Sequence, residues 1–271
     1  MRNFFPGKHR IKFTFLAVSL ATVGCSEQRA PDQAALLADS TPVVPAAAPV
    51  DSAAINTLTE AETREGWRLL FDGKSTAAFR GYNQPAFPTQ GWKAQDGLLV
   101  VEAAPGGPKD RLGGDIVTKE QFDNFEFKLD FKLSPGANSG ILYLVKETKD
   151  PSWHSAPEFQ LIDNEVWAKQ LDMNKRRTGD AYDMQASVRD AMKPIGEWNE
   201  AMIRVKDGQV EHWLNGQKVV AYTLGSPEWK TKVKGSKFAA YPEYGASKKG
   251  YLGIQEHGHQ LWFRNLKVRE I

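Results

Sequence analysis

The sequence of 271 residues contains one cysteine, Cys25, so no disulfide can form within the chain. A domain built from it must be held together by its hydrophobic core alone. The sequence also lacks a hydrophobic run of the ~20 residues that a membrane-spanning helix needs. Its longest apolar block, residues 13–23, is about half that length. These absences exclude a disulfide-stapled scaffold and an integral membrane protein.

A strong net charge is also absent. The chain has a formal net charge of +2, and removal of residues 1–24 takes away four positive charges and no negative one, which leaves −2. A nearly neutral protein has no electrostatic basis for binding nucleic acid. We therefore predict no nucleic-acid partner.

The N-terminus has the order of a secretory signal. Residues 2–12 hold four basic side chains and no acid, and the apolar block 13–23 and the small residue Gly24 follow. A basic region, a short apolar region and a small residue before the cut are typical of a cleaved signal peptide. We predict that residues 1–24 are this signal and that the protein is exported.

Cys25 lies directly after the predicted cut. Residues 21–25 read ATVGC, which resembles the lipobox of bacterial lipoproteins, where the cysteine thiol takes a diacylglycerol and becomes the new N-terminus. Thr22 departs from the leucine of most lipoboxes. We predict lipidation at Cys25 and a membrane anchor, with the protein in the periplasm or at the outer membrane or cell surface. The alternative is a cleaved, unlipidated signal with an incidental cysteine.

Residues 25–63 are rich in alanine and proline, most clearly in VVPAAAPVDSAA. Few bulky apolar side chains are available there to offset chain entropy. We predict a flexible, disordered spacer, with local helix over 59–64. Residues 64–271 then form one domain, a size that suits a single β-sandwich.

The domain shows the period-two alternation of β-strands. Residues 125–133 read FEFKLDFKL, with apolar side chains on one face and charged ones on the other. Residues 140–146 are apolar on both faces, which indicates a central covered strand. Further strands are predicted at 201–205, 210–214, 218–223, 251–255 and 262–269. Asp-Gly and Asn-Gly turns separate several of them. The pattern predicts an all-β antiparallel sandwich.

Several short phrases in this order resemble one family, the 3-keto-disaccharide hydrolases. They are LFDGK at 70–74, NSGI at 138–141, EFQLID at 158–163, TGDAY at 178–182, EWN at 197–199, LNG at 214–216, GIQEHG at 253–258 and FRNL at 263–266. The resemblance covers nearly all of residues 64–271. It implies a concanavalin A-like (laminin G-like) jelly-roll of two antiparallel sheets, with a sugar site on the concave face and activity on 3-keto-glucosides. At 142–144 this chain has LYL, where many members have an aromatic pair and an arginine.

Glu158 and Gln160 are the first candidate site residues. At strand period they face the same way, while Phe159 and Leu161 face the core. Either they form a ligand face, with a catalytic carboxylate and an amide that fixes a sugar hydroxyl, or they are a solvated strand face. Asp163 has the opposite parity to Glu158. It is either a second catalytic carboxylate at the rim or a structural residue that starts a turn.

His257 is the second catalytic candidate. Gln255, His257 and His259 share parity, and Gly258 permits irregular backbone. Either His257 transfers protons or binds a metal, or it is a hydrogen-bonded structural histidine. Gln255 is a candidate for substrate binding. His212 is predicted to face solvent.

Other candidates for substrate binding come from loops and strand ends. Asn138 can read hydroxyls with its donor and acceptor or close an Asx turn. Tyr182 can contact a sugar or lie at the core rim, and Arg264 can pair with a carboxylate inside the concave face. Trp153 and Trp167 can stack on a sugar. Three other tryptophans, Trp198, Trp213 and Trp262, are predicted to lie in the core. The lysines of 230–249 are predicted to lie on a solvated loop and not to form an anion site.

A 3-keto sugar allows a particular chemistry. Its C3 carbonyl acidifies the C2 proton, so a base can form an enolate, the C1 group can leave by elimination, and water can add back. A divalent metal could polarise the carbonyl, although no ligand spacing establishes one. The chief alternative is a non-catalytic carbohydrate-binding module on the same sandwich; a structural surface lipoprotein is the third. The oligomeric state does not follow from the sequence.

Overall fold

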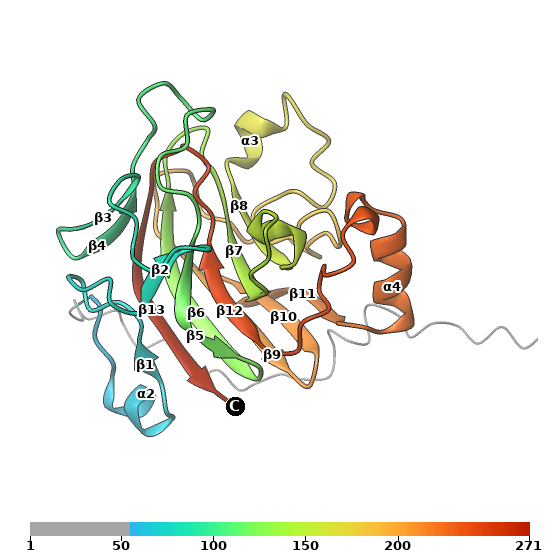
Figure 1. The fold of residues 1–271 in the computed structure, drawn as a ribbon, viewed down its shortest axis with the longest axis horizontal. Coiled ribbons are helices and arrows are strands. Elements are labelled where there is room, and N and C mark those ends of the chain that lie inside the picture. The colour runs from blue at the N-terminus through green and yellow to red at the C-terminus, as the bar shows by residue number, and fades with distance from the viewer. Residues whose placement is uncertain (1–54) are drawn as a thin grey trace, which may run out of the picture. The chain divides into compact units, whose positions relative to one another are not determined.

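The computed structural model describes residues 55–271, so the predicted signal, Cys25 and most of the predicted spacer lie outside the described residues. Two antiparallel sheets pack face to face (Figure 1). The larger sheet has the order β11-β10-β9-β6-β13-β4-β3, with β1 paired to β13, and the smaller has the order β2-β5-β12-β7-β8. The prediction of an all-β jelly-roll sandwich is confirmed. Within residues 55–271, no helix is long and apolar enough to cross a membrane.

The strands of the larger sheet are β1 (Arg68–Leu69), β3 (Trp92–Gln95), β4 (Leu98–Val101), β6 (Phe125–Leu133), β9 (Asn199–Lys206), β10 (Gln209–Leu214), β11 (Gln217–Thr223) and β13 (Leu261–Glu270). Those of the smaller sheet are β2 (Phe79–Gly81), β5 (Ile116–Phe122), β7 (Asn138–Val145), β8 (Glu158–Ile162) and β12 (Gly250–Ile254). The helical elements are α2 (Glu60–Arg64), α3 (Asn164–Trp167), α4 (Pro227–Lys234) and the 3₁₀ turns η1 (Ser152–His154) and η2 (Lys237–Ala240).

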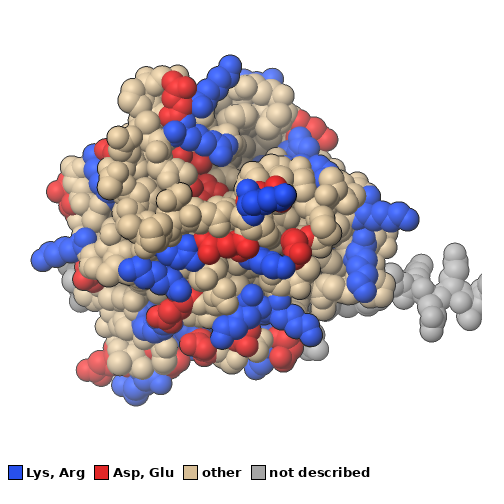
Figure 2. Space-filling model, in the orientation of Figure 1, with Lys and Arg blue, Asp and Glu red and all other residues tan. Residues whose placement is uncertain are grey.

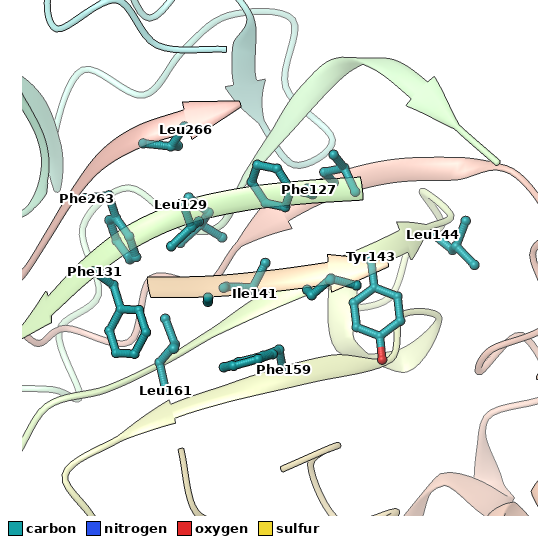
Figure 3. Packing of buried hydrophobic residues seen from close by; sticks show 14 of the residues in the cluster. Phe127, Leu129, Phe131, Ile141, Tyr143, Leu144, Phe159, Leu161, Phe263 and Leu266 are labelled. Atoms are coloured by element: carbon teal, nitrogen blue, oxygen red, sulfur yellow. The ribbon is translucent and has the colours of Figure 1, made fainter. Parts of the chain in front are cut away.

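The core lies between the two sheets. Along β6, each side chain of the apolar face is buried, from Phe125 to Leu133. Phe159 and Leu161 of β8 face this layer from the smaller sheet (Figure 3). Because side chains alternate along a strand, the intervening residues Glu158 and Gln160 point to the opposite, outer face of the smaller sheet. The core pattern predicted for these two strands is confirmed.

The outer face of the smaller sheet is covered at one end. A second apolar cluster lies there, formed by Val117, Leu142, Val145 and Ala156. Strand β7 is thus buried on both sides, as its sequence predicts. The rest of this outer face, beside Glu158, is open.

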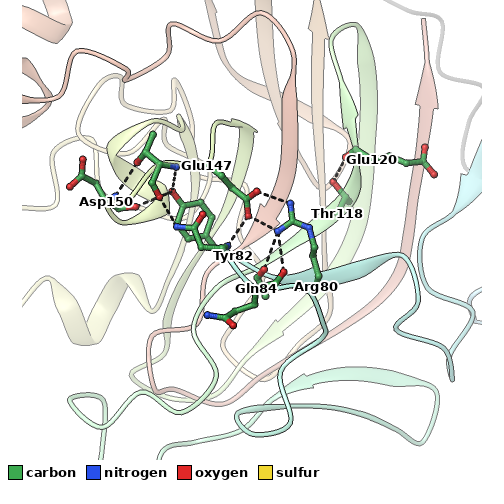
Figure 4. A network of polar contacts seen from close by, with 10 residues as sticks. Arg80, Tyr82, Gln84, Thr118, Glu120, Glu147 and Asp150 are labelled. Atoms are coloured by element: carbon green, nitrogen blue, oxygen red, sulfur yellow. Dashed lines mark hydrogen bonds and ion pairs between the residues drawn. The ribbon is translucent and has the colours of Figure 1, made fainter.

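Loops around this open face are fixed by specific contacts. Arg80 of β2 forms an ion pair with Glu147, with 2.8 Å between Nη2 and Oε2, and Asn83 donates its backbone N–H to Glu147 at 2.7 Å. The hydroxyl of Tyr82 donates to the carbonyl of Asp150 at 2.9 Å (Figure 4). These contacts tie the loop after β7, which carries η1, to β2.

A column of aromatic rings fixes α4 and η2. Tyr222 of β11 stacks on Trp229 with centroids 4.9 Å apart, Trp229 stacks on Tyr244 at 5.7 Å, and Tyr244 stacks on Phe238 at 3.8 Å. Trp229 is the one buried residue of α4, and Ser226 caps the helix by accepting the Trp229 N–H. A single apolar anchor produces no helical stripe, which is why the sequence analysis did not predict α4.

The N-terminal part of the domain begins earlier than predicted. Asn56 is buried and exchanges hydrogen bonds with Asn265, at 2.7 and 2.8 Å, and α2 is attached to β13 by an ion pair between Glu62 and Lys267. Residues 56–63 therefore pack on the larger sheet, and the predicted flexible spacer does not extend to residue 63. The helix predicted at 59–64 is confirmed, with Thr59 as its N-cap.

The prediction that His212 faces solvent is wrong. On β10, alternation places His212 on the buried face with Val210 and Leu214. Its Nδ1 lies 3.1 Å from the carbonyl of Gly179 and its Nε2 lies 2.8 Å from the hydroxyl of Tyr143. Burial lowers the pKa of His212 to about 4. The ring is therefore neutral at neutral pH, with Nδ1 donating to Gly179 and Nε2 accepting from Tyr143.

Replacing His212 with leucine is expected to lower the free energy of unfolding by about 3 kcal/mol, because two buried polar groups lose their partner. The wild-type histidine has a folded pKa below its unfolded value. Between about pH 6.5 and pH 4 the unfolded chain therefore binds a proton at this histidine that the folded protein does not. The free energy of unfolding falls as the pH decreases through this range. Denaturant unfolding at pH 7 and pH 5 measures both effects. If His212→Leu were as stable as wild type at pH 7, the hydrogen-bonded role would be contradicted.

Candidate active site

A pocket of about 220 Å³ opens on the outer face of the smaller sheet. Its lining residues come from strands β7 and β8 and from five segments that connect strands: Arg111, Asn138, Trp153, Glu158, Gln160, Tyr182, Lys237, Phe238, Gln255 and His257. Figure 2 shows that this face of the molecule is hollowed and that charged side chains surround the hollow. Pockets for drug-sized ligands span roughly 300–1,000 Å³, so this one suits a single sugar ring.

Glu158 lies at the centre of the chemistry. It is 6 % exposed, and among the described residues none forms a hydrogen bond with its carboxylate. Burial raises the pKa of Glu158 to about 8, the charge of Lys237 lowers it, and that of Asp115 raises it further. A carboxyl group that exchanges its proton near neutral pH and faces a pocket is suited to general acid–base catalysis.

Gly140 makes the space that Glu158 occupies. Gly140 pairs with Gln160 across the β7–β8 ladder. A Cβ at this glycine would lie 2.5 Å from the carboxyl carbon of Glu158. Because Gly140 has no side chain, the carboxylate of Glu158 can lie directly on its backbone.

Two amides stand beside the carboxylate. Gln160 donates from Nε2 to Oδ1 of Asn138 at 3.0 Å. This contact fixes both side chains and leaves the NH₂ of Asn138 and the carbonyl oxygen of Gln160 for a ligand. Gln255 lies next to Gly140 as well, since its backbone N–H donates to the carbonyl of Gly140 at 2.9 Å. The three predicted amides thus line one pocket with Glu158.

His257 follows β12 and also lines the pocket. Burial, assisted by the charge of Arg111, lowers the pKa of His257 to about 4, so its imidazole is neutral at neutral pH. Its Nδ1 is buried without a partner in the described chain, as are Nδ1 of His259 and Oε2 of Glu256. A neutral imidazole can donate one hydrogen bond and accept another, but it is not an acid near pH 7.

Lys237 and Arg111 were not predicted from the sequence. The ammonium of Lys237 lies 4.1 Å from the ring centroid of Tyr182 and 5.1 Å from that of Trp153, and both aromatic residues also line the pocket. Cation–π contacts of this kind fix the charge in place. Lys237 is exposed, as predicted, but it also lines the pocket.

The prediction of a solvated loop for the lysines of 230–249 is wrong at three positions. Lys230, Lys232 and Lys234 lie on α4. Lys232 is also half-buried and donates to Gln185 at 2.6 Å.

Removing the Lys237 charge is expected to raise the pKa of Glu158 further, because that charge is what lowers it. If Glu158 acts as a base, kcat/KM rises with pH as its carboxyl group loses its proton. For Lys237→Met we expect this rise to move to higher pH and kcat/KM at pH 7 to fall about 10- to 100-fold. Lys234→Met, a change of the same kind at the end of α4, is the matched control. A profile unchanged in Lys237→Met would contradict the electrostatic coupling.

The structure places two predicted site residues outside the pocket. Asp163 caps α3, accepting the backbone N–H groups of Glu165 and Val166 at 3.1 Å and that of Gly136 at 2.8 Å. Its predicted alternative, a structural residue that starts a turn, agrees with this placement.

Arg264 lies on β13 of the other sheet, where it forms an ion pair with Asp130 at 3.0 Å. Its expected position inside the sugar-binding face is therefore wrong, because β13 belongs to the larger sheet. The prediction that Trp198, Trp213 and Trp262 are core residues is wrong, because all three are half-buried. Trp213 and Trp262 lie on strands of this sheet and Trp198 directly precedes β9, and Lys132 lies over the rings of Trp198 and Trp262.

A divalent metal fits the described residues poorly. Oxygen and nitrogen donors are present in the pocket, but no group of three or more His, Cys, Asp or Glu side chains in residues 55–271 is arranged to hold an ion. The donors that do converge are one carboxylate, one imidazole and amides. We therefore derive no step through a metal.

The fold and the pocket together define a carbohydrate-active β-sandwich protein. Residues 66–269 match the family described as the 3-keto-alpha-glucoside-1,2-lyase-like domain. A 3-keto-disaccharide hydrolase of Bacteroides thetaiotaomicron is 36% identical over 228 residues, which are 76% of this chain and 78% of that protein. The chain belongs to this family, as its motifs predict, and is a glycoside hydrolase.

Two solved structures from Parabacteroides distasonis, both named as candidate glycosyl hydrolases, share the fold. The first is 37% identical with a TM-score of 0.71 and covers 80% of this chain and 99% of its own. The second is 28% identical with a TM-score of 0.57 and covers 76% of this chain and 99% of its own. The family relationship thus extends over almost the whole described domain.

Proposed function

We propose that the protein cleaves 3-keto-glucosides, including 3-keto-disaccharides, by elimination and addition of water. The observation that carries this proposal is Glu158, a buried carboxyl group with a pKa of about 8 in a pocket for one sugar ring. The name of the Bacteroides relative and the lyase-like family description support the same substrate class and an elimination at C1–C2.

Glu158 acts as the proton carrier. Its carboxylate removes the proton from C2, and the electron pair moves to the C3 oxygen, giving an enolate. The amide of Asn138 and the charge of Lys237 stabilise that oxygen. The enolate then expels the C1 group, whose oxygen takes the proton from Glu158. Water next adds to C1, losing a proton to Glu158, which returns one to C2; the sum is hydrolysis.

An ordinary glycosidase mechanism requires two carboxylates that flank the bond. Glu158 is the one carboxyl group among the described residues that line the pocket, since Asp163 caps α3. Elimination from a 3-keto sugar needs one carboxyl group, so the composition of the pocket favours elimination over the ordinary glycosidase mechanism. The neutral amides and aromatic rings also suit a binding module, but a carboxyl with a raised pKa has no use in that role.

The reaction can be tested with an aryl 3-keto-glucoside and its parent glucoside in D₂O. We expect release of the aryl group from the keto substrate alone and deuterium at C2 of the sugar product beyond that in an enzyme-free control. Sugar binding without release would instead favour the carbohydrate-binding module. Release without deuterium at C2 would favour direct displacement.

We also propose that the enzyme is exported and anchored through a lipid on Cys25. The basic and apolar segments before Cys25 support this location. Mass spectrometry of the membrane fraction tests it: a diacylglyceryl adduct on Cys25 is expected, and a soluble chain that begins after another residue would overturn it.

A further inference from the structure

The pocket lining contains two cations and one carboxyl group. Arg111 and Lys237 both line it, and neither forms an ion pair with another residue in the described part of the chain. The one carboxyl group in the lining, Glu158, is largely protonated at pH 7, and His257 is uncharged. The other lining residues carry amides or aromatic rings.

Asp115, which is not among the lining residues, is also affected by the charge of Arg111, because burial raises the pKa of Asp115 and this charge lowers it. The carboxyl group of Asp115 already accepts hydrogen bonds from the Ser152 hydroxyl and the Glu256 backbone N–H. Within the lining itself, two cations therefore face one carboxyl group.

The two cations act on different parts of the pocket. Beyond the effect of burial, the charge of Lys237 lowers the pKa of Glu158. The charge of Arg111 instead lowers the pKa values of His257, His259 and Asp115. Lys237 is also held over the rings of Tyr182 and Phe238, which line the same pocket as Glu158. Arg111 is exposed, and its charge acts on His257 but is not among the charges that shift the pKa of Glu158. The chemistry at C2 and C3 therefore uses one cation and leaves the other for a different part of the substrate.

We propose that Arg111 binds a carboxylate on the aglycone of the substrate, so that the enzyme prefers acidic 3-keto-glycosides. This inference rests on the proposed function. A guanidinium offers paired N–H donors that match the two oxygens of a carboxylate. In this position it selects the group attached at C1, while Lys237 and the amides hold the keto sugar. A second sugar that carries a carboxyl group, or an aromatic acid, has this chemistry.

Two aryl 3-keto-glucosides test the inference, one with a 4-(carboxymethyl)phenyl group and one with the isosteric 4-(carbamoylmethyl)phenyl group. The methylene insulates the leaving oxygen, so the two groups leave about equally well. We expect wild type to favour the carboxylate by about 10-fold or more in kcat/KM at low salt, mainly through KM. In Arg111→Ala this ratio falls to near 1, and 0.5 M salt narrows it in wild type because exposed charges are screened.

Lys109→Ala removes a positive charge from the same loop at a position outside the pocket lining, and we expect it to keep the wild-type ratio. A ratio near 1 in wild type, or an unchanged ratio in Arg111→Ala, would overturn the role of Arg111 while cleavage still stands.

If neither substrate is cleaved, the proposed function fails, and calorimetric titration with the two parent glucosides then decides the role of Arg111. Tighter binding of the carboxylate that is lost in Arg111→Ala supports the role. Equal binding of the two glucosides, or none, overturns it.

Discussion

Glu158→Gln is expected to lower kcat on a 3-keto-glucoside by about 10³-fold, within the range that a general acid–base group contributes. Glutamine has nearly the same shape and retains the hydrogen-bonding capacity of the protonated acid. It cannot accept the C2 proton. The loss should therefore appear in kcat with little change in KM, and steady-state kinetics measures both. Glu197→Gln, an exposed glutamate away from the pocket, is the matched control.

The pH dependence gives a second readout of the same residue. A base must be deprotonated, so kcat/KM of wild type should rise with pH and be half-maximal near pH 8, the pKa of Glu158. The rise should disappear from the residual activity of Glu158→Gln. A variant that retained full activity, or a wild-type profile without a limb near pH 8, would show that another group moves the proton.

The buried carboxyl also affects stability in a defined pH window. Its folded pKa of about 8 exceeds the ordinary value of 4.5, so between these values the unfolded chain loses a proton that the folded protein keeps. The free energy of unfolding therefore falls as the pH rises from about 4.5 to about 8. Glu158→Gln removes this penalty, so its stability relative to wild type should increase across that window.

Gly140→Ala is expected to lower kcat/KM by about 10²-fold or more while the protein still folds. The new Cβ would meet the carboxyl end of Glu158, which can rotate away, and no backbone atom is among its three nearest neighbours. The carboxylate would then leave the position from which it reaches C2, and small misplacements of catalytic groups can cost about 10²-fold. Steady-state kinetics and a thermal melt separate the two effects.

Gly235→Ala provides the control for Gly140→Ala. Its Cβ would lie no closer than 3.6 Å to another atom. Both activity and melting temperature should stay near wild type. If Gly140→Ala were fully active, Glu158 would either have another working position or not be the base.

The sequence predicts the sheet residues of the site well. Glu158 and Gln160 were placed on one face because strand periodicity fixes which side chains share a side. Their partner Asn138 comes from the adjacent strand β7, and register brings it within 3.0 Å of Gln160. The alternation of side chains along a strand is enough to predict the positions of these residues, because they lie in regular strands.

The residues that sequence reasoning missed lie on irregular segments. Lys237 reaches the pocket because Trp229, Tyr244 and Phe238 stack, a contact between separated segments that periodicity cannot show. Arg111 lies in a loop between β4 and β5 with no pattern of its own. Such long-range contacts cannot be derived from local sequence patterns. His212 is a different case, because its shared parity with Val210 and Leu214 already indicates the buried face of β10.

The attachment of the N-terminal segment has a consequence for orientation. Asn56 and α2 are bonded to β13 of the larger sheet, whereas the pocket opens through the outer face of the smaller one. The chain thus enters the domain on the side opposite the substrate entrance. A bead or vesicle attached to the chain just before Asn56 should therefore leave the pocket open, so immobilisation there should not lower kcat/KM on a 3-keto-glucoside.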